Sequence, residues 1–346
     1  PGGLQKRQKE KRVKERRNGT MENQNHPSVA VIVPAYRPGE PFGRLLRMLG
    51  MQTYPADAII LINTEQEYWD ASGYDSMARE MPQVQICHIT KEQFDHGGTR
   101  NLAAARADQD ILVFMTDDAV PADRNLLEEL VRAFSLQGPE GETVAAAYAR
   151  QLPNEGCGVI ERYTREFNYP PESRVKTRAD LPELGIKTYF CSNVCCAYRR
   201  DIFQKQGGFL KRTLFNEDMI FAAGLIQSGY AVAYAAGARV FHSHDLTPVQ
   251  QFRRNFDLAV SQADHPEVFA DLPSEGEGKR LVKQTAWRLV RTGQVWQLPA
   301  PAAPSGGKNL GDRMGKAYKK LPRSVVLRCT MNPDYWKKKK RRKRQA

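Results

Sequence analysis

The chain has 346 residues, 41% of them hydrophobic, and a formal net charge of +13. This length can bury one large core or two modest ones. Residues 1–20 hold eight Lys or Arg and two Glu, and residues 337–344 are all Lys or Arg, which leaves 36 basic and 37 acidic residues in 21–336. Because a nucleic-acid groove would place basic residues within the folded body, this neutral body argues against a nucleic-acid partner.

The basic ends need a separate explanation. Residues 1–27 are predicted to be a disordered segment, and Met21 would make a natural start. Residues 337–346 form a basic tail, which could attract an anionic membrane surface at on the order of 1 kcal/mol per residue, or could simply be solvated. No apolar stretch approaches the length of a membrane span, so we expect a soluble or peripheral protein. The six Cys lack zinc-finger spacing and are predicted to be free thiols in a reducing cytoplasm.

The first half of the chain alternates strands with helices. Val29 begins an apolar, β-branched run that is typical of a strand buried on both faces. Further strands are predicted at 58–63, 84–89 and 111–116, with helices around 42–49 and 101–107. This alternation predicts right-handed crossovers and a doubly wound sheet, whose ligands gather beyond the carboxyl ends of the strands.

The second half is less regular and predicts a mixed sheet. Strands are expected at 143–149, 188–192 and 230–245, the last broken by Gly237. Helices are expected around 219–227, 250–260 and 280–290, and 298–307 has the composition of a flexible link. We therefore predict an α/β fold over 28–270 followed by a helical extension over 271–336.

Two carboxylates, Asp117 and Asp118, follow the fourth predicted strand directly. A carboxylate at a strand end suits Mg²⁺ or Mn²⁺ when waters and substrate phosphates supply the other ligands. The alternative is that one of them completes a turn or caps the next helix.

Asn216, Glu217 and Asp218 precede an apolar helical face. Asn216 could be the N-cap, and acids at a helix start are stabilised by the helix dipole. The functional alternative is that one of the acids is a general base within reach of an acceptor hydroxyl.

His242 and His244 lie on the same side of an extended strand, just before Asp245. Imidazole nitrogens can join a carboxylate in binding Mn²⁺, although a histidine is more often a hydrogen-bonded structural residue.

The segment FDHGGTRN (94–101) places two glycines and Arg100 at a helix start after the third strand. Exposed N–H groups and the helix dipole would suit a diphosphate, with Arg100 adding a charged contact. The segment matches neither a Walker loop nor GxGxxG, and it could also be only a turn.

In this order the segments resemble the family 2 glycosyltransferases of the GT-A fold, and more narrowly their bacterial rhamnosyltransferase-like branch. The resemblance covers roughly residues 28 to 270. It rests on IVPAY (32–36), FDHGGTRN, VFMTDDAVP (113–121), FNYP (167–170), SNVCCAYRR (192–200), GGF (207–209), FNEDM (215–219) and HSHDLTPVQQFRRNFD (242–257).

The resemblance implies roles for particular residues. Asp118 would be the metal-binding Asp of the DxD-like motif, Asp218 the catalytic base, and His244 a further metal or diphosphate contact. Thr116 stands where a strict DxD would have its first Asp. The donor nucleotide would contact Pro34, Tyr36, Asn63, Asp95, Gly98, Arg100 and Asp117, and the acceptor region would include Asn193 and Glu217.

The implied activity is inverting transfer of a sugar from a nucleotide diphosphate, with dTDP-L-rhamnose favoured and a UDP-hexose or UDP-hexosamine as the alternative donor. The acceptor would be a polysaccharide or lipid-linked glycan in cell-surface biosynthesis, at the cytoplasmic face of the bacterial plasma membrane. A nucleotidyltransferase would need an activating loop that the sequence does not show. A non-catalytic nucleotide-sugar-binding or nucleic-acid-binding protein is the alternative of another class.

Overall fold

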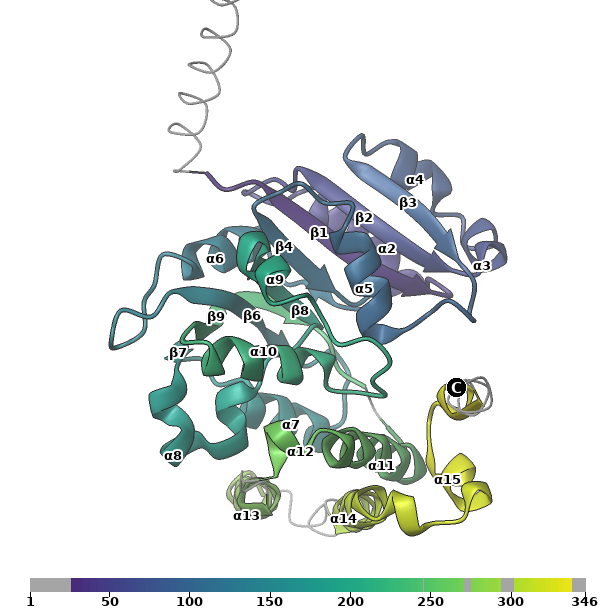
Figure 1. The fold of residues 1–346 in the computed structure, drawn as a ribbon, viewed down its shortest axis with the longest axis vertical. Helices are drawn as coiled ribbons and strands as arrows, with labels where there is room; N and C mark the ends of the chain where they lie inside the picture. The colour runs from purple at the N-terminus through teal and green to yellow at the C-terminus, as the bar shows by residue number, and fades with distance from the viewer. Residues whose placement is uncertain (1–25, 245, 271–274, 294–301, 338–346) are drawn as a thin grey trace, which may run out of the picture.

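The computed structural model describes residues 26–244, 246–270, 275–293 and 302–337 (Figure 1). Its sheet begins with four parallel strands in the order β3-β2-β1-β4. These strands are β1 (Val29–Tyr36), β2 (Ala58–Thr64), β3 (Val84–Ile89) and β4 (Ile111–Met115). All four lie where they were predicted, because each run is apolar and, apart from the edge strand β3, buried almost throughout.

Beyond β4 the sheet becomes mixed. β8 (Cys195–Arg199) lies antiparallel between β4 and β6 (Val144–Leu152), and β6 pairs in parallel with β9 (Ala231–Phe241). The short strands β5 (Val120–Pro121) and β7 (Arg174–Lys176) both pair antiparallel with β9. The carboxyl ends of β1, β2, β4, β6 and β9 therefore share one edge of the sheet.

One predicted strand is wrong, and another is interrupted. Residues 188–192 are not a strand, because the chain there leaves a 3₁₀ helix, η3 (Gly185–Tyr189), and the strand that follows is β8. The apolar side chains of residues 188–192 reflect burial of an irregular segment. At Gly237 the pairing of β9 with β6 jumps from Ala235 to Arg239, so the predicted break is a bulge within one strand. The strand ends at Phe241, so His242 and His244 follow it and do not lie on it as predicted.

Helices cover both faces of the sheet, which confirms the doubly wound α/β fold. One core contains the apolar side chains of α2 (Glu40–Leu49), α3 (Gln66–Asp70), α4 (Asp75–Arg79) and α6 (Leu126–Ala133). The core on the opposite face contains those of α5 (His96–Ala104), α9 (Arg200–Lys205) and α10 (Glu217–Gln227). α5 begins before the predicted 101, since Asp95 caps it.

The C-terminal helices gather at one end of the molecule (Figure 1). They are α11 (Pro248–Asp264), α12 (Pro266–Phe269), α13 (Glu275–Arg291), α14 (Ala302–Lys316), η5 (Tyr318–Lys320) and α15 (Arg323–Cys329). The connection from β6 to β8 contains α7 (Val159–Asn168), η2 (Arg178–Asp180) and α8 (Leu181–Leu184). The predicted link at 298–307 is wrong for 302–307, which begin α14, while 298–301 lie outside the described residues.

Most of the two basic chain ends lies outside the described residues, whereas all six cysteines lie within them. Residues 1–25 of the predicted N-terminal segment, and 338–346 of the predicted tail, lie outside the described residues. Within the described part, no helix is long and apolar enough to cross a membrane. All six cysteines are described and are free thiols, as predicted.

Candidate active site

Asp117 and Asp118 lie at the carboxyl edge of the sheet, directly beyond β4. The Asp117 carboxylate accepts a hydrogen bond of 3.0 Å from the backbone N–H of Tyr36, which ends β1. Burial raises the pKa of Asp117 to about 6; the Tyr36 N–H opposes this shift, and the neighbouring Asp118 charge adds to it. Asp117 thus joins the ends of two adjacent strands, one of which carries Pro34.

His242 and His244 approach Asp118 from the end of β9. Their Nε2 atoms lie 3.6 Å and 3.3 Å from the Asp118 carboxylate oxygens. One ligand atom from each of the three residues lies within 4.8 Å of the others, which makes a group that could hold a metal ion. The resemblance implied Asp118 and His244 as metal contacts, and His242, the other histidine of the segment, lies beside the same carboxylate.

The buried His242 is held in one tautomer. Its Nδ1 lies 3.0 Å from Gln151 Oε1, which can only accept, so Nδ1 carries the proton and Nε2 offers its lone pair toward Asp118. Burial lowers the pKa of His242 to about 3, although Asp118 acts in the opposite direction. A neutral imidazole with a free Nε2 is the form that binds metals.

Asp218 lies in the first turn of α10, half-buried and with its carboxylate hydrogen-bonded. One oxygen accepts from the backbone N–H of Asn193 at 3.0 Å and the other from that of Met219 at 2.8 Å. The pKa of Asp218 is raised to about 7, mainly by partial burial and then by the Glu217 charge, while hydrogen bonds from the two amides oppose the shift. A carboxylate with this pKa suits a general base at neutral pH.

Glu217 and Arg100 form a buried ion pair next to Asp218. Their charged atoms are 3.2 Å apart, and their side chains are only 8% and 7% exposed. Burial alone would raise the pKa of Glu217, but Arg100 and His96 outweigh it, so the net shift is downward. Arg100 also donates to the His96 carbonyl at 3.0 Å, so its guanidinium is already bonded within the protein.

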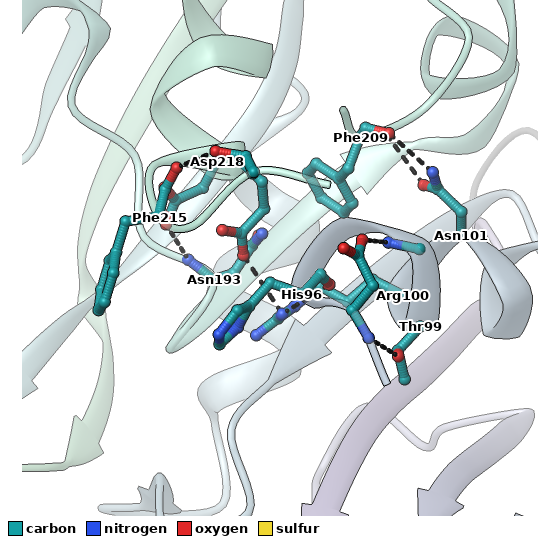
Figure 2. Close-up of polar contacts among 12 residues, drawn as sticks. His96, Thr99, Arg100, Asn101, Asn193, Phe209, Phe215 and Asp218 are labelled. Atoms are coloured by element: carbon teal, nitrogen blue, oxygen red, sulfur yellow. Dashed lines mark hydrogen bonds and ion pairs between the residues drawn. The ribbon is translucent and has the colours of Figure 1, made fainter. Parts of the chain in front are cut away.

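The segment around Asp95 joins α5 to the loop that precedes α10. Asp95 accepts from the N–H of Gly98 at 2.7 Å and from that of Arg212 at 3.0 Å. Asn101 exchanges two hydrogen bonds with the Phe209 backbone, at 2.8 Å and 2.9 Å (Figure 2). A Cβ on Gly97 would lie 2.1 Å from the Leu210 carbonyl oxygen. The N–H of Gly98 was expected to face a diphosphate, but in the structure it donates to Asp95.

A cavity of about 220 Å³ brings Tyr36 and Asp95 together. Asn63 is fully buried and donates to the Glu65 carbonyl at 2.9 Å, with His88 Nδ1 3.1 Å from its amide nitrogen. The next residue, Thr64, lines the cavity instead.

Two arginines near the site were not singled out in the sequence. Arg165 donates a hydrogen bond to Gln151, the partner of His242. The guanidinium carbon of Arg254 lies 5.7 Å from the centre of the Phe215 ring, and burial lowers its pKa, as does Arg165. Arg254 belongs to the QQFRRNFD segment that carried the resemblance, but spacing alone could not distinguish it from Arg253.

The family model for glycosyl transferase family 2 matches residues 30–207, just over half of the chain. The chain belongs to this family. It is 37% identical over 313 residues to the O-antigen chain rhamnosyltransferase RfbN of Salmonella typhimurium, covering 89% of this chain and 96% of that protein. It is also 37% identical to the O-antigen chain rhamnosyltransferase WbaN of Salmonella anatum, covering 90% of this chain and 96% of that protein.

A solved structure shares the fold of this glycosyltransferase. The mannosyltransferase PcManGT from Pyrobaculum calidifontis, in complex with GDP-mannose and Mn²⁺, superimposes with a TM-score of 0.52. The two chains are 18% identical, and the match covers 90% of this chain and 83% of the other. The predicted GT-A type fold and the predicted glycosyltransferase family are thus confirmed.

Proposed function

We propose that this family 2 glycosyltransferase transfers L-rhamnose from dTDP-L-rhamnose to a polysaccharide or lipid-linked glycan, with inversion at the anomeric carbon. The donor sugar is supported by the 37% identity to two O-antigen rhamnosyltransferases over almost their full length. The reaction is supported by Asp218, whose carboxylate accepts two backbone hydrogen bonds and whose pKa of about 7 suits removal of a proton from an acceptor hydroxyl. Asn193 and Glu217 border this carboxylate, where we place the acceptor.

Asp118, His242 and His244 are the residues that would hold a divalent metal. Their donor set fits the metal, because two imidazoles with one carboxylate suit Mn²⁺ better than Mg²⁺, which prefers oxygen ligands. When bound, the metal supplies Lewis-acid stabilisation of the departing diphosphate. Asp117 accepts from the N–H of Tyr36 at the end of β1 beside this group. Asp95, which caps α5 through the Gly98 N–H, also accepts from Arg212 in the loop before α10, and Arg100 pairs with Glu217 in the first turn of α10.

We also place the reaction at the inner face of the bacterial plasma membrane, where a lipid-linked acceptor would be presented. This part of the proposal rests on the curated relatives and on the basic residues from 337 to 344.

Two variants separate the proposed roles of the carboxylates. Asp218→Asn should keep donor binding and lose at least about a hundredfold in kcat, the usual contribution of a general base. Asp118→Ala should lose metal-dependent donor binding. Thermal shift with dTDP-rhamnose, UDP-glucose, UDP-N-acetylglucosamine and GDP-mannose, each with and without Mn²⁺, measures binding in the same preparations.

Asp201→Asn, on the exposed start of α9, is the matched control. Normal turnover in Asp218→Asn would exclude Asp218 as the base. Stabilisation by a UDP-sugar in place of dTDP-rhamnose would replace the proposed donor but leave the transferase.

A further inference from the structure

The cavity of about 220 Å³ is lined by residues of the N-terminal half of the chain and by residues that follow the last helix, α15. Tyr36 and Thr64, at the ends of β1 and β2, form one side, and Asp95 lies at the start of α5. Asn332, Asp334 and Tyr335, which follow α15, form another side. The C-terminal extension therefore reaches the edge of the sheet where we place the donor.

Residues 332–335 form the C-terminal wall of the cavity, and the residues on either side of them contact the C-terminal helices. The Met331 N–H donates to the Asp257 carboxylate on α11 at 2.8 Å. The Trp336 ring is 7% exposed, and its centre lies 5.5 Å from that of Tyr318. The Trp336 carbonyl accepts from Arg323 at 3.1 Å. Residues 332–335 therefore lie between Met331 and Trp336, which are both bound to these helices.

The same wall contacts the loops around the cavity. The Tyr335 hydroxyl donates to the Arg212 carbonyl at 3.3 Å, and the Arg212 N–H in turn donates to Asp95. Lys91 Nζ lies 3.4 Å from the Asp334 carboxylate. These contacts tie the C-terminal wall to Asp95.

The size and chemistry of the cavity fit one flat polar ring. Its volume is below the roughly 300 to 1,000 Å³ of pockets that enclose whole drug-sized ligands. Tyr36, Phe94 and Tyr335 offer aromatic side chains, and Asp95 offers a carboxylate. The Thr64 hydroxyl is buried and has no hydrogen-bond partner among the residues that the structure describes.

We propose that residues 332–335 complete the pocket for the pyrimidine base of the donor, with Tyr335 as a specificity-determining residue. A pyrimidine dione offers two faces for stacking, one ring N–H that a carboxylate can accept, and carbonyl oxygens that a threonine hydroxyl can reach. A purine has a second ring, for which the cavity leaves less room. The inference rests on the proposed function, because it takes the donor to be a nucleotide sugar.

The test is nucleotide binding to the full chain carrying Tyr335→Leu, measured by calorimetry with dTDP, UDP, GDP and inorganic pyrophosphate in the presence of Mn²⁺. Loss of a stacking ring should weaken dTDP and UDP binding about tenfold, while pyrophosphate, which has no base, should bind as to the wild type. Tyr230→Leu, a tyrosine outside the cavity, should bind all four as the wild type does. Asp334→Asn, at a side chain that is 39% exposed, should weaken dTDP binding without unfolding the wall.

Three outcomes would overturn the inference: unchanged dTDP binding in both cavity variants, equal loss of dTDP and pyrophosphate binding, or wild-type affinity for GDP equal to that for dTDP. A wild type that binds dTDP through Tyr335 yet transfers no rhamnose would overturn the proposed donor sugar alone. A wild type that transfers rhamnose while both Tyr335→Leu and Asp334→Asn bind dTDP normally would contradict the role of residues 332–335 alone.

Discussion

The carboxyl of Asp218 has its pKa near neutrality because of where the backbone places it. Burial raises this pKa to about 7, with a further contribution from Glu217. Only the deprotonated form can take a proton from an acceptor. The transfer rate, measured as kcat/KM, should therefore fall as pH decreases through about 7.

Glu217→Gln tests this electrostatic coupling. The variant removes a negative charge that raises the pKa of Asp218 and leaves Arg100, which lowers it, so the midpoint of the pH profile should move to lower pH. The pH dependence of kcat/KM measures the shift. Asp201→Asn should leave the midpoint in place, and an unchanged or higher midpoint in Glu217→Gln would contradict the coupling.

Backbone strain is also concentrated around this edge of the sheet. Four non-glycine residues in the described part of the chain have a positive φ, and each borders the candidate site. They are Arg37 after Tyr36, Glu65 after Thr64, Arg212 beside Asp95, and Asn216 before Glu217. Asn216 is the N-cap residue of α10, as the sequence suggested, but its side chain makes no cap hydrogen bond. Such conformations persist where the surrounding structure fixes them, as at binding sites.

At the scale of elements, α14 packs unusually closely along α11. Gly307, Gly311 and Gly315 lie four residues apart on α14, so they share one face of the helix. A Cβ on Gly311 would lie 2.3 Å from the Phe252 carbonyl oxygen, and one on Gly315 would lie 2.4 Å from that of Phe256. The glycines therefore allow backbone contact between the two helices.

Gly311→Val should push α14 away from α11, because the atom it meets belongs to the backbone. We expect a loss of about 1 to 3 kcal/mol in the free energy of unfolding, measured by urea titration. Gly306→Ala is the matched control, since a Cβ there meets nothing within 4 Å. This control should be neutral or stabilising by up to about 1 kcal/mol. Equal effects in the two variants would show that the close contact does not hold the helices together.

At the scale of the whole molecule, the charge divides between a neutral body and basic ends. If the run from 337 to 344 contacts anionic lipid, the full chain should bind liposomes containing phosphatidylserine more tightly than a chain ending at Trp336. Sedimentation with the liposomes measures this difference, which should shrink as salt is added. Equal binding by the two chains would remove the membrane contact and leave the transferase reaction untouched.

The parallel strands and the position of the two strand-end carboxylates follow from the sequence. The apolar, β-branched runs at 29–36, 58–64 and 111–115 can only be satisfied by burial on both faces, so Asp117 and Asp118 had to emerge at the carboxyl edge. The resemblance then selected Asp218 from three polar residues at a helix start. The apolar run at 188–192 was wrongly predicted to be a strand, because a buried irregular segment has the same apolar composition as a strand.

Which distant residues come into contact depends on how the strands and helices pack. The order β4-β8-β6-β9 brings His242 to Asp118, and the packing of α5 against the loop before α10 pairs Arg100 with Glu217. Likewise, the C-terminal helices carry Tyr335 to the cavity beside Tyr36. Local spacing reports which face of an element is buried, but it carries no information about its neighbour in the sheet or the partner of a buried charge. Those contacts depend on long-range packing, which the fold alone specifies.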